Sequence, residues 1–149
     1  MLSNAPAAPA LFRSRSHPDG EITRPPTAPC IVVVDDDDDI RDLLAIKLRA
    51  AGYRTLTASD GDAALELAAR ERPDLMILDV SMPGMDGLAV CTQVHRQDGM
   101  ADVPVLIVSA RAMPYDIDLG LAVGADDYLT KPFSPNELLT RVRTLLNAA

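Results

Sequence analysis

Residues 31–44 read IVVVDDDDDIRDLL, and this stretch decides the fold class that we expect. Ile31–Val34 is a continuous apolar run, which is typical of a strand buried on both faces of a parallel sheet. Five aspartates follow it directly. Beyond them, apolar residues recur at helical spacing up to Gly52, which predicts an amphipathic helix with a glycine stop. These apolar residues are Ile40, Leu43, Leu44, Leu48 and Ala51.

The alternation of apolar runs and helical segments continues to the C-terminus and makes five pairs in all. The other predicted strands are Arg54–Ala58, Leu75–Val80, Val103–Val108 and Asp127–Leu129. The other predicted helices run from Asp60 to Arg72, from Asp86 to near Gly99, around Met113–Val123, and from Ser134 onward. Right-handed crossovers then predict an α/β fold: a doubly wound, five-stranded parallel sheet of order 2-1-3-4-5 with five helices, flavodoxin-like.

The composition of the 149 residues argues against several classes of protein. Residues 1–29 hold 6 of the 12 prolines and no periodic apolar pattern, so they are predicted to be a disordered tail before one domain over residues 30–149. A net charge of −8 and an aromatic content of 3% argue against direct contact with nucleic acid. No apolar run approaches the roughly 20 residues of a membrane span. With only Cys30 and Cys91, both expected to be inert thiols, the protein is expected to be cytoplasmic.

Acidic residues lie at the carboxyl ends of two of the predicted strands. Asp35 and Asp36 follow the first strand, and Asp79 follows the apolar run Leu75–Leu78. Because these two strands are neighbours in the predicted order, the three carboxylates are expected to share one pocket. Two carboxylates about 4 Å apart repel by roughly 4 kcal/mol at an effective dielectric near 20, which calls for a divalent cation. Oxygen ligands without His or Cys favour Mg²⁺ over zinc.

The last two predicted strands add a hydroxyl group and a cation at the same edge. Ser109 directly follows Val103–Val108, and Lys131, one of two lysines in the chain, lies just beyond Asp127–Leu129. Carboxylates for a metal, one ammonium group and one hydroxyl donor suit a phosphoryl group, because phosphoryl transfer is catalysed mainly by positioning and charge neutralisation.

These residues resemble the receiver domain of bacterial two-component response regulators, here expected to stand alone. The resemblance covers about residues 30–149 and rests on four motifs in order. They are IVVVDDDDDIRDLL (Ile31–Leu44), DLMILDVSMPGMDG (Asp74–Gly87), VPVLIVSA (Val103–Ala110) and GADDYLTKPFSPNELL (Gly124–Leu139).

The resemblance implies an acceptor and a metal site. Asp79 would be the phospho-acceptor and would form a 4-aspartylphosphate. Asp36, Asp79 and the backbone carbonyl of Ser81 would bind Mg²⁺ directly, and Asp35 would bind it through water.

The resemblance also implies a switch. Lys131 would pair with the phosphoryl group, and Ser109 would move toward it. Tyr128 would turn inward when Ser109 moves, and the Lys131–Pro132 peptide bond would be cis. The chain would then be a phosphorylation-controlled switch and not an enzyme, catalysing only its own phosphoryl transfer and slow dephosphorylation.

The implied phosphodonor is a sensor histidine kinase or a histidine phosphotransfer protein, and the implied output is a downstream effector protein. That effector would bind the surface formed by the fourth helix, fifth strand and fifth helix. A homodimer through the same surface is a further candidate, although Ile117 and Leu119 stand where such receivers commonly carry basic residues.

Two other functions stay open at this point. A Mg²⁺-dependent phosphohydrolase of the haloacid-dehalogenase type would use Asp35 as nucleophile with Asp37 two residues on, but it leaves Asp79 without a role. A vestigial interaction module would keep the fold without the chemistry. Steady phosphoester turnover that survives Asp79→Asn would favour the first. Partner binding that ignores Mg²⁺ and acetyl phosphate would favour the second.

Overall fold

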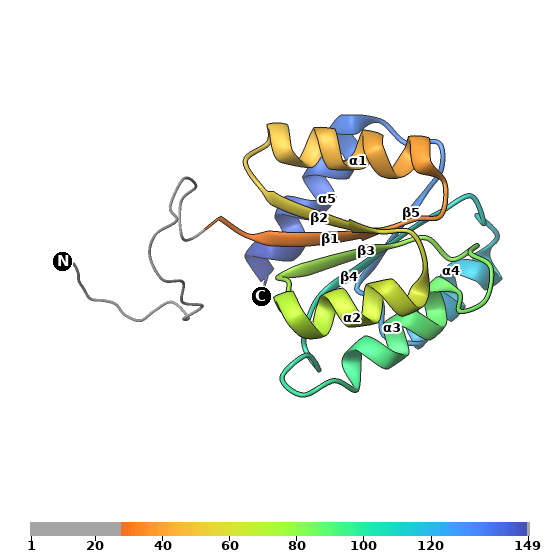
Figure 1. The fold of residues 1–149 in the computed structure, drawn as a ribbon. Coiled ribbons are helices and arrows are strands. Elements are labelled where there is room, and N and C mark those ends of the chain that lie inside the picture. The colour runs from red at the N-terminus through yellow and green to blue at the C-terminus, as the bar shows by residue number, and fades with distance from the viewer. Residues whose placement is uncertain (1–27, 149) are drawn as a thin grey trace.

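The computed structural model describes residues 28–148. Strands and helices alternate along this part of the chain (Figure 1). The strands are β1 Cys30–Val34, β2 Arg54–Ala58, β3 Leu75–Leu78, β4 Val105–Ser109 and β5 Asp127–Thr130. The helices are α1 Asp38–Ala50, α2 Gly61–Glu71, α3 Gly87–His95, α4 Pro114–Ala122 and α5 Pro135–Ala148.

The strands form one parallel sheet in the order β2-β1-β3-β4-β5, which confirms the predicted fold. Within β1, Val34 pairs with Ala58 of β2 on one side and with Leu78 of β3 on the other. The residues that directly follow β1 and β3 therefore emerge at the same edge of the sheet. In open α/β sheets this edge, at the reversal of strand order, is where ligands bind.

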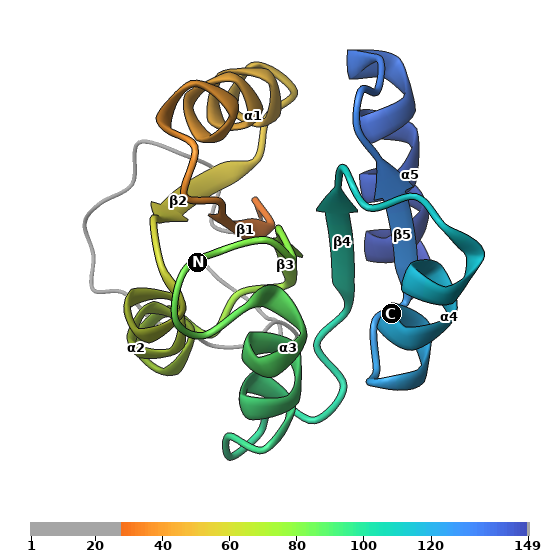
Figure 2. The ribbon, with the colours of Figure 1, turned by 90° about the vertical axis from the view of Figure 1, so that its right-hand side faces the viewer.

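Helices cover both faces of the sheet (Figure 2). On one face, α1 and α5 pack against alternate strand residues, so that Leu44 and Val142 belong to the same buried cluster as Val33. On the other face lie α2, α3 and α4, and the neighbouring Val32 belongs to a second cluster with Val90. Because every residue of β1, β3 and β4 is buried, these strands need the continuous apolar runs that the sequence shows.

Aspartates fix the starts of the first three helices. The side chain of Asp37 accepts hydrogen bonds from the amides of Asp39 and Ile40 at the start of α1. Asp60 accepts from the amide of Ala63 at the start of α2, and Asp86 accepts from the amide of Ala89 at the start of α3. Such caps satisfy amide groups that have no partner within the helix. Part of the acidic run therefore serves helix formation.

Several predicted boundaries and burial assignments were wrong. Strand β3 ends at Leu78, before Asp79 and Val80, and α3 ends at His95 instead of near Gly99. In α1, Leu43 is 45% exposed, and Ala45 is buried in its place. Successive helical residues differ by about 100° around the axis, so Leu43 lies on the flank of the face that Leu44 centres.

The predicted tail over residues 1–29 lies outside the described residues except for its last two, and its disorder stays a prediction. The carbonyl of Pro29 accepts a hydrogen bond from the amide of Arg54 at 2.9 Å, so pairing with β2 begins one residue before the predicted domain start. Between residues 28 and 148, no helix has the length and apolar character that crossing a membrane requires.

Candidate functional site

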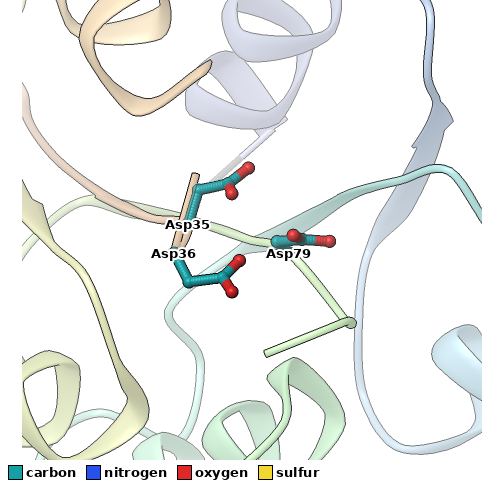
Figure 3. A group of neighbouring side chains, drawn as sticks. All are labelled: Asp35, Asp36 and Asp79. Atoms are coloured by element: carbon teal, nitrogen blue, oxygen red, sulfur yellow. The ribbon is translucent and has the colours of Figure 1, made fainter. Parts of the chain in front are cut away.

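Three carboxylates gather at the edge where β1 and β3 end. Asp35 and Asp36 follow β1, and Asp79 follows β3 (Figure 3). One ligand oxygen from each lies within 4.8 Å of the other two. The fold therefore brings together the three acidic side chains that the strand order predicted, although Asp35 and Asp79 are 44 residues apart in the sequence.

The two aspartates after β1 occupy different environments. The Asp35 side chain is 2% exposed, and its Oδ1 accepts a hydrogen bond from the amide of Asp37 at 2.9 Å. Asp36 is exposed, so its carboxylate faces solvent beside the buried pair. Asp37 uses its carboxylate to cap α1. The cluster thus has one solvent-facing carboxylate and two buried ones.

Lys131 connects the two buried carboxylates. Its Nζ lies 3.0 Å from Oδ2 of Asp35 and 3.6 Å from Oδ2 of Asp79. Burial alone would lower the pKa of Lys131, but the hydrogen bond and charge of Asp35, together with the charge of Asp79, outweigh burial and raise this pKa. The ammonium group is therefore held protonated at the centre of the acidic site.

The surroundings of Asp79 disfavour the charged form of its carboxyl group. Burial raises the pKa of Asp79, and the nearby charge of Asp35 raises it further, while Lys131 and the amide of Ser81 act in the opposite direction. That amide donates to Oδ1 of Asp79 at 3.2 Å. The loop from Asp79 to the start of α3 therefore orients one carboxylate oxygen.

Gly87 at the start of α3 allows a close approach to the main chain of Asp79. A Cβ atom at position 87 would overlap the carbonyl oxygen of Asp79 and lie 2.8 Å from its carbonyl carbon. The amide of Gly87 donates to the carbonyl of Val80 at 3.2 Å. The sequence showed Gly87 only as a helix start, because nothing in its spacing reveals which backbone it meets.

Ser109 and Tyr128 meet at one residue, Arg111. The amide of Arg111 donates to Oγ of Ser109 at 3.1 Å, and its carbonyl accepts from the hydroxyl of Tyr128 at 2.8 Å. Its Nε donates to Oγ of Ser81 at 3.2 Å. Tyr128 is 7% exposed, so its side chain already lies inward. The predicted inward turn of Tyr128 stays a prediction. The Lys131–Pro132 bond is cis, as predicted.

The residues of the site suit a hard divalent cation. All three side chains of the cluster offer carboxylate oxygens, the ligands that Mg²⁺ prefers, and the exposed Asp36 leaves room for the waters that Mg²⁺ retains. The single ammonium group of Lys131 faces two buried carboxylates, so a negative charge remains for a cation to offset. His and Cys are absent from this cluster, which disfavours zinc.

Comparison with known proteins agrees with this geometry. The family model for the response regulator receiver domain matches residues 31–143. The alkaline phosphatase synthesis transcriptional regulatory protein PhoP of Bacillus subtilis is 48% identical over 116 residues, which cover 78% of this chain and 48% of that protein. The DNA-binding dual master transcriptional regulator RpaA of Synechocystis is 46% identical over 118 residues, covering 79% and 49%. The chain spans about half the length of the curated relatives it matches.

Solved structures show the same fold. Chemotaxis protein CheY4 of Vibrio cholerae superposes with a TM-score of 0.77 at 35% identity, covering 80% of this chain and 99% of CheY4. The receiver domain of sensor histidine kinase PA1611 from Pseudomonas aeruginosa, solved with a magnesium ion coordinated in its active site cleft, superposes with a TM-score of 0.75 at 29% identity, covering 81% and 99%. Sequence family, topology and acidic site agree, and the chain belongs to the response regulator receiver domain family.

Proposed function

We propose that this chain is a cytoplasmic switch in which Mg²⁺-dependent phosphorylation of Asp79 changes the surface formed by α4, β5 and α5. The observation that carries this proposal is the cluster of Asp35, Asp36 and Asp79 within 4.8 Å, with Lys131 between its buried members. A phosphoryl acceptor needs a nucleophilic carboxylate and groups that neutralise the transferred charge, and this cluster supplies both.

In the proposed reaction, an Oδ atom of Asp79 bonds to the phosphorus of a phosphohistidine. The P–N bond breaks, and its electron pair stays on the imidazole nitrogen, which takes up a proton. The product is an aspartyl phosphate. The amide of Ser81 holds Oδ1 of Asp79, which leaves the other carboxylate oxygen for attack. Lys131, 3.6 Å from Oδ2, is placed to pair with the transferred oxygens.

The proposed metal ligands are Asp36, Asp79 and the carbonyl of Ser81, with Asp35 acting through water. A bound Mg²⁺ would supply Lewis-acid neutralisation of the phosphoryl oxygens. The contacts of Asp35 support its indirect role, because its two oxygens already accept from Lys131 and from the amide of Asp37. Asp36 is free to face solvent and the ion.

The proposed switch runs from Ser109 to Tyr128. When Asp79 carries a phosphoryl group, the hydroxyl of Ser109 is expected to turn toward it and leave the amide of Arg111. The carbonyl of Arg111 accepts a hydrogen bond from the hydroxyl of Tyr128, so a movement of Arg111 would also move the hydrogen-bond partner of the Tyr128 ring. Tyr128 lies on β5, and α4 packs against it, which connects the site to the output surface.

The proposed partners are a histidine kinase or histidine phosphotransfer protein as donor and an effector protein as output. In this structure Arg141 pairs with Asp127 at 2.9 Å and with Glu137 at 3.6 Å within the chain. The charges of these three side chains are therefore paired within one chain. A homodimer through this surface remains a second candidate. Both relatives are named as transcriptional regulators, so the comparisons do not support the expectation that this chain makes no contact with nucleic acid.

The test is labelling of the purified chain by acetyl phosphate, followed on phosphate-affinity gels. We expect full labelling with Mg²⁺, loss of labelling with EDTA, and loss in Asp79→Asn. Asp60→Asn is the matched control, because Asp60 caps α2 and asparagine caps equally well. Labelling of Asp79→Asn equal to the control, or no labelling of the parent, would overturn the proposal.

The same reactions address the two other functions when released phosphate is measured beside the label on the protein. A dehalogenase-type phosphohydrolase predicts continuous phosphate release that survives Asp79→Asn and is lost in Asp35→Asn. A vestigial module predicts no label on the parent under any condition. Family membership and the use of Asp37 as a helix cap both favour the receiver function over the hydrolase.

A further inference from the structure

Helix α4 rests on the sheet through a residue without a side chain. Gly120 is its one buried residue, and Ile117 is partly buried against the same core cluster. Apolar side chains on the same helix remain in solvent: Tyr115 is 73% exposed and Leu121 is 44% exposed. Glycine in a helix interior costs stability relative to alanine, so its presence here calls for a reason in the packing.

The reason is the aromatic ring beneath it. A Cβ atom at position 120 would lie 3.0 Å from Cδ2 and Cε2 of Tyr128 and 3.0 Å from Cδ1 of Ile107. Ile107 and Tyr128 are register partners on β4 and β5, so they form one surface under the helix. A residue without a side chain lets α4 approach this surface without crowding the inward ring, whereas an added methyl group would force the ring, the end of Ile107 or the helix to shift.

The ring is not free to move aside in response. Its hydroxyl donates to the carbonyl of Arg111 at 2.8 Å, in the loop that leads into α4. Tyr128 is thus held at its hydroxyl by Arg111 and covered on its edge by Gly120. A methyl group at position 120 would have to displace the ring, the end of Ile107 or the helix.

We propose that Gly120 is a positioning residue that acts through Tyr128 and couples the inward position of this ring to the docking of α4. This inference rests on the proposed function, in which Tyr128 carries the effect of phosphorylation to the output surface. Gly120 sets how closely α4 sits when the ring is inward. An outward movement of the ring would remove the Tyr128 part of the surface that supports α4 and leave Ile107.

The test follows the Tyr128 ring by NMR of the full chain with ¹³C at the tyrosine ε carbons. The chain has 3 tyrosines, and the exposed Tyr115 gives an internal solvent reference. In Gly120→Ala we expect the Tyr128 resonance to shift toward that of Tyr115, and α4 amides to exchange with deuterium faster. Asp118→Ala is the matched control, because Asp118 is an exposed α4 residue whose replacement also raises helix propensity.

A second measurement separates the ring contact from general loss of packing. Tyr128→Ala removes both ring contacts and leaves only the flexible end of Ile107 near position 120, so in this background Gly120→Ala should raise the urea midpoint through the higher helix propensity of alanine. In the parent background it should lower the midpoint or leave it unchanged. An unshifted Tyr128 resonance in Gly120→Ala, a shift of equal size in Asp118→Ala, or the same midpoint change in both backgrounds would overturn the proposal.

A third arm keeps the two proposals distinguishable. Mg²⁺ with beryllofluoride, a mimic of the phosphoryl group, should change the Tyr128 resonance of the parent and change it less in Gly120→Ala. A parent that shows the ring contact but no response to beryllofluoride would contradict the proposed function and the coupling role built on it, while the contact itself stands. A response of equal size in both proteins would overturn the coupling alone.

Discussion

Lys131 pairs more closely with Asp35 than with Asp79: its Nζ lies 3.0 Å from Oδ2 of Asp35 and 3.6 Å from Oδ2 of Asp79. The carboxylate that the lysine holds most tightly is therefore not the proposed acceptor. Asp79 keeps part of its charge uncompensated, and its raised pKa reflects burial together with the proximity of Asp35. In the proposed function, a bound cation would offset this remaining charge.

Removing the lysine should destabilise the unphosphorylated protein. Lys131→Ala leaves two buried carboxylates without their shared partner, and we expect the free energy of unfolding to fall by about 2 kcal/mol, less than for a fully buried pair because solvent reaches the site. Urea denaturation measures this change. Lys47→Ala, at the other lysine of the chain, is the control and should cost less than about 0.5 kcal/mol.

Mg²⁺ should restore part of the stability lost in Lys131→Ala, because a cation between the carboxylates replaces the missing charge. The rise in melting temperature on adding Mg²⁺ is expected to be larger in this variant than in the parent. Equal stability of the two lysine variants, or an equal Mg²⁺ effect in variant and parent, would contradict the role given to Lys131.

Gly87→Ala should be one of the most damaging single changes outside the carboxylates. Its Cβ would overlap the carbonyl of Asp79, a backbone group that cannot move without displacing the acceptor. We expect a loss of about 3 kcal/mol in urea denaturation. Asp86→Ala removes only the adjacent cap of α3 and should cost about 1 kcal/mol. The packing argument fails if Gly87→Ala is no worse than this cap removal.

The ion pair between Arg54 and Glu71 should make the free energy of unfolding depend on pH in the acidic range. The hydrogen bond from Arg54, followed by that from Arg70, lowers the pKa of Glu71 below its ordinary 4.5. Because the folded-state pKa is the lower one, this stabilisation is present above about pH 4.5 and is lost as pH falls through the folded value.

Glu71→Gln should therefore cost about 0.5–1 kcal/mol at pH 7 and progressively less below pH 4.5, measured by urea denaturation at several pH values. Glu66→Gln, at an exposed position on the same helix, is the control and should show a smaller difference at each pH. A cost for Glu71→Gln that stays constant from pH 7 to pH 3 would rule out the ion pair as its source.

Neither cysteine should react in the folded protein. Burial raises the pKa of Cys91 to about 11, and burial also raises the pKa of Cys30. The thiolate is the reactive form, so a disulfide reagent at pH 7 is expected to modify neither side chain in native buffer and both in urea. Rapid native labelling of either thiol would show that the side chain opens to solvent far more readily than its packing suggests.

The fold was predictable because its strongest determinants are local. Continuous apolar runs such as Ile31–Val34 mark buried strands, and right-handed crossovers leave few ways to order them. The acidic cluster was predictable from that strand order, which brings Asp79 beside Asp35 and Asp36. Lys131, placed by its position after β5, does contact Asp35 and Asp79, whereas the part given to Ser109 stays a prediction.

Other features depend on tertiary contacts that one sequence does not display. The exposure of Leu43 depends on how α1 rotates against the sheet. Helix α3 ends at His95, whose Nε2 lies 2.9 Å from the carbonyl oxygen of Val103, a contact that the sequence does not reveal. Gly87 and Gly120 are small because other groups approach them closely. Only the structure shows the close approach that each glycine allows.

The central claim is that Asp79, and not an aspartate after β1, accepts the phosphoryl group. The most direct measurement treats the full chain with Mg²⁺ and acetyl phosphate, reduces the acyl phosphate with borohydride, and locates the resulting homoserine by tandem mass spectrometry. We predict homoserine at position 79 in the phosphorylated protein. Homoserine at position 35, 36 or 37, or a phosphorylated protein with none at position 79, would contradict the account.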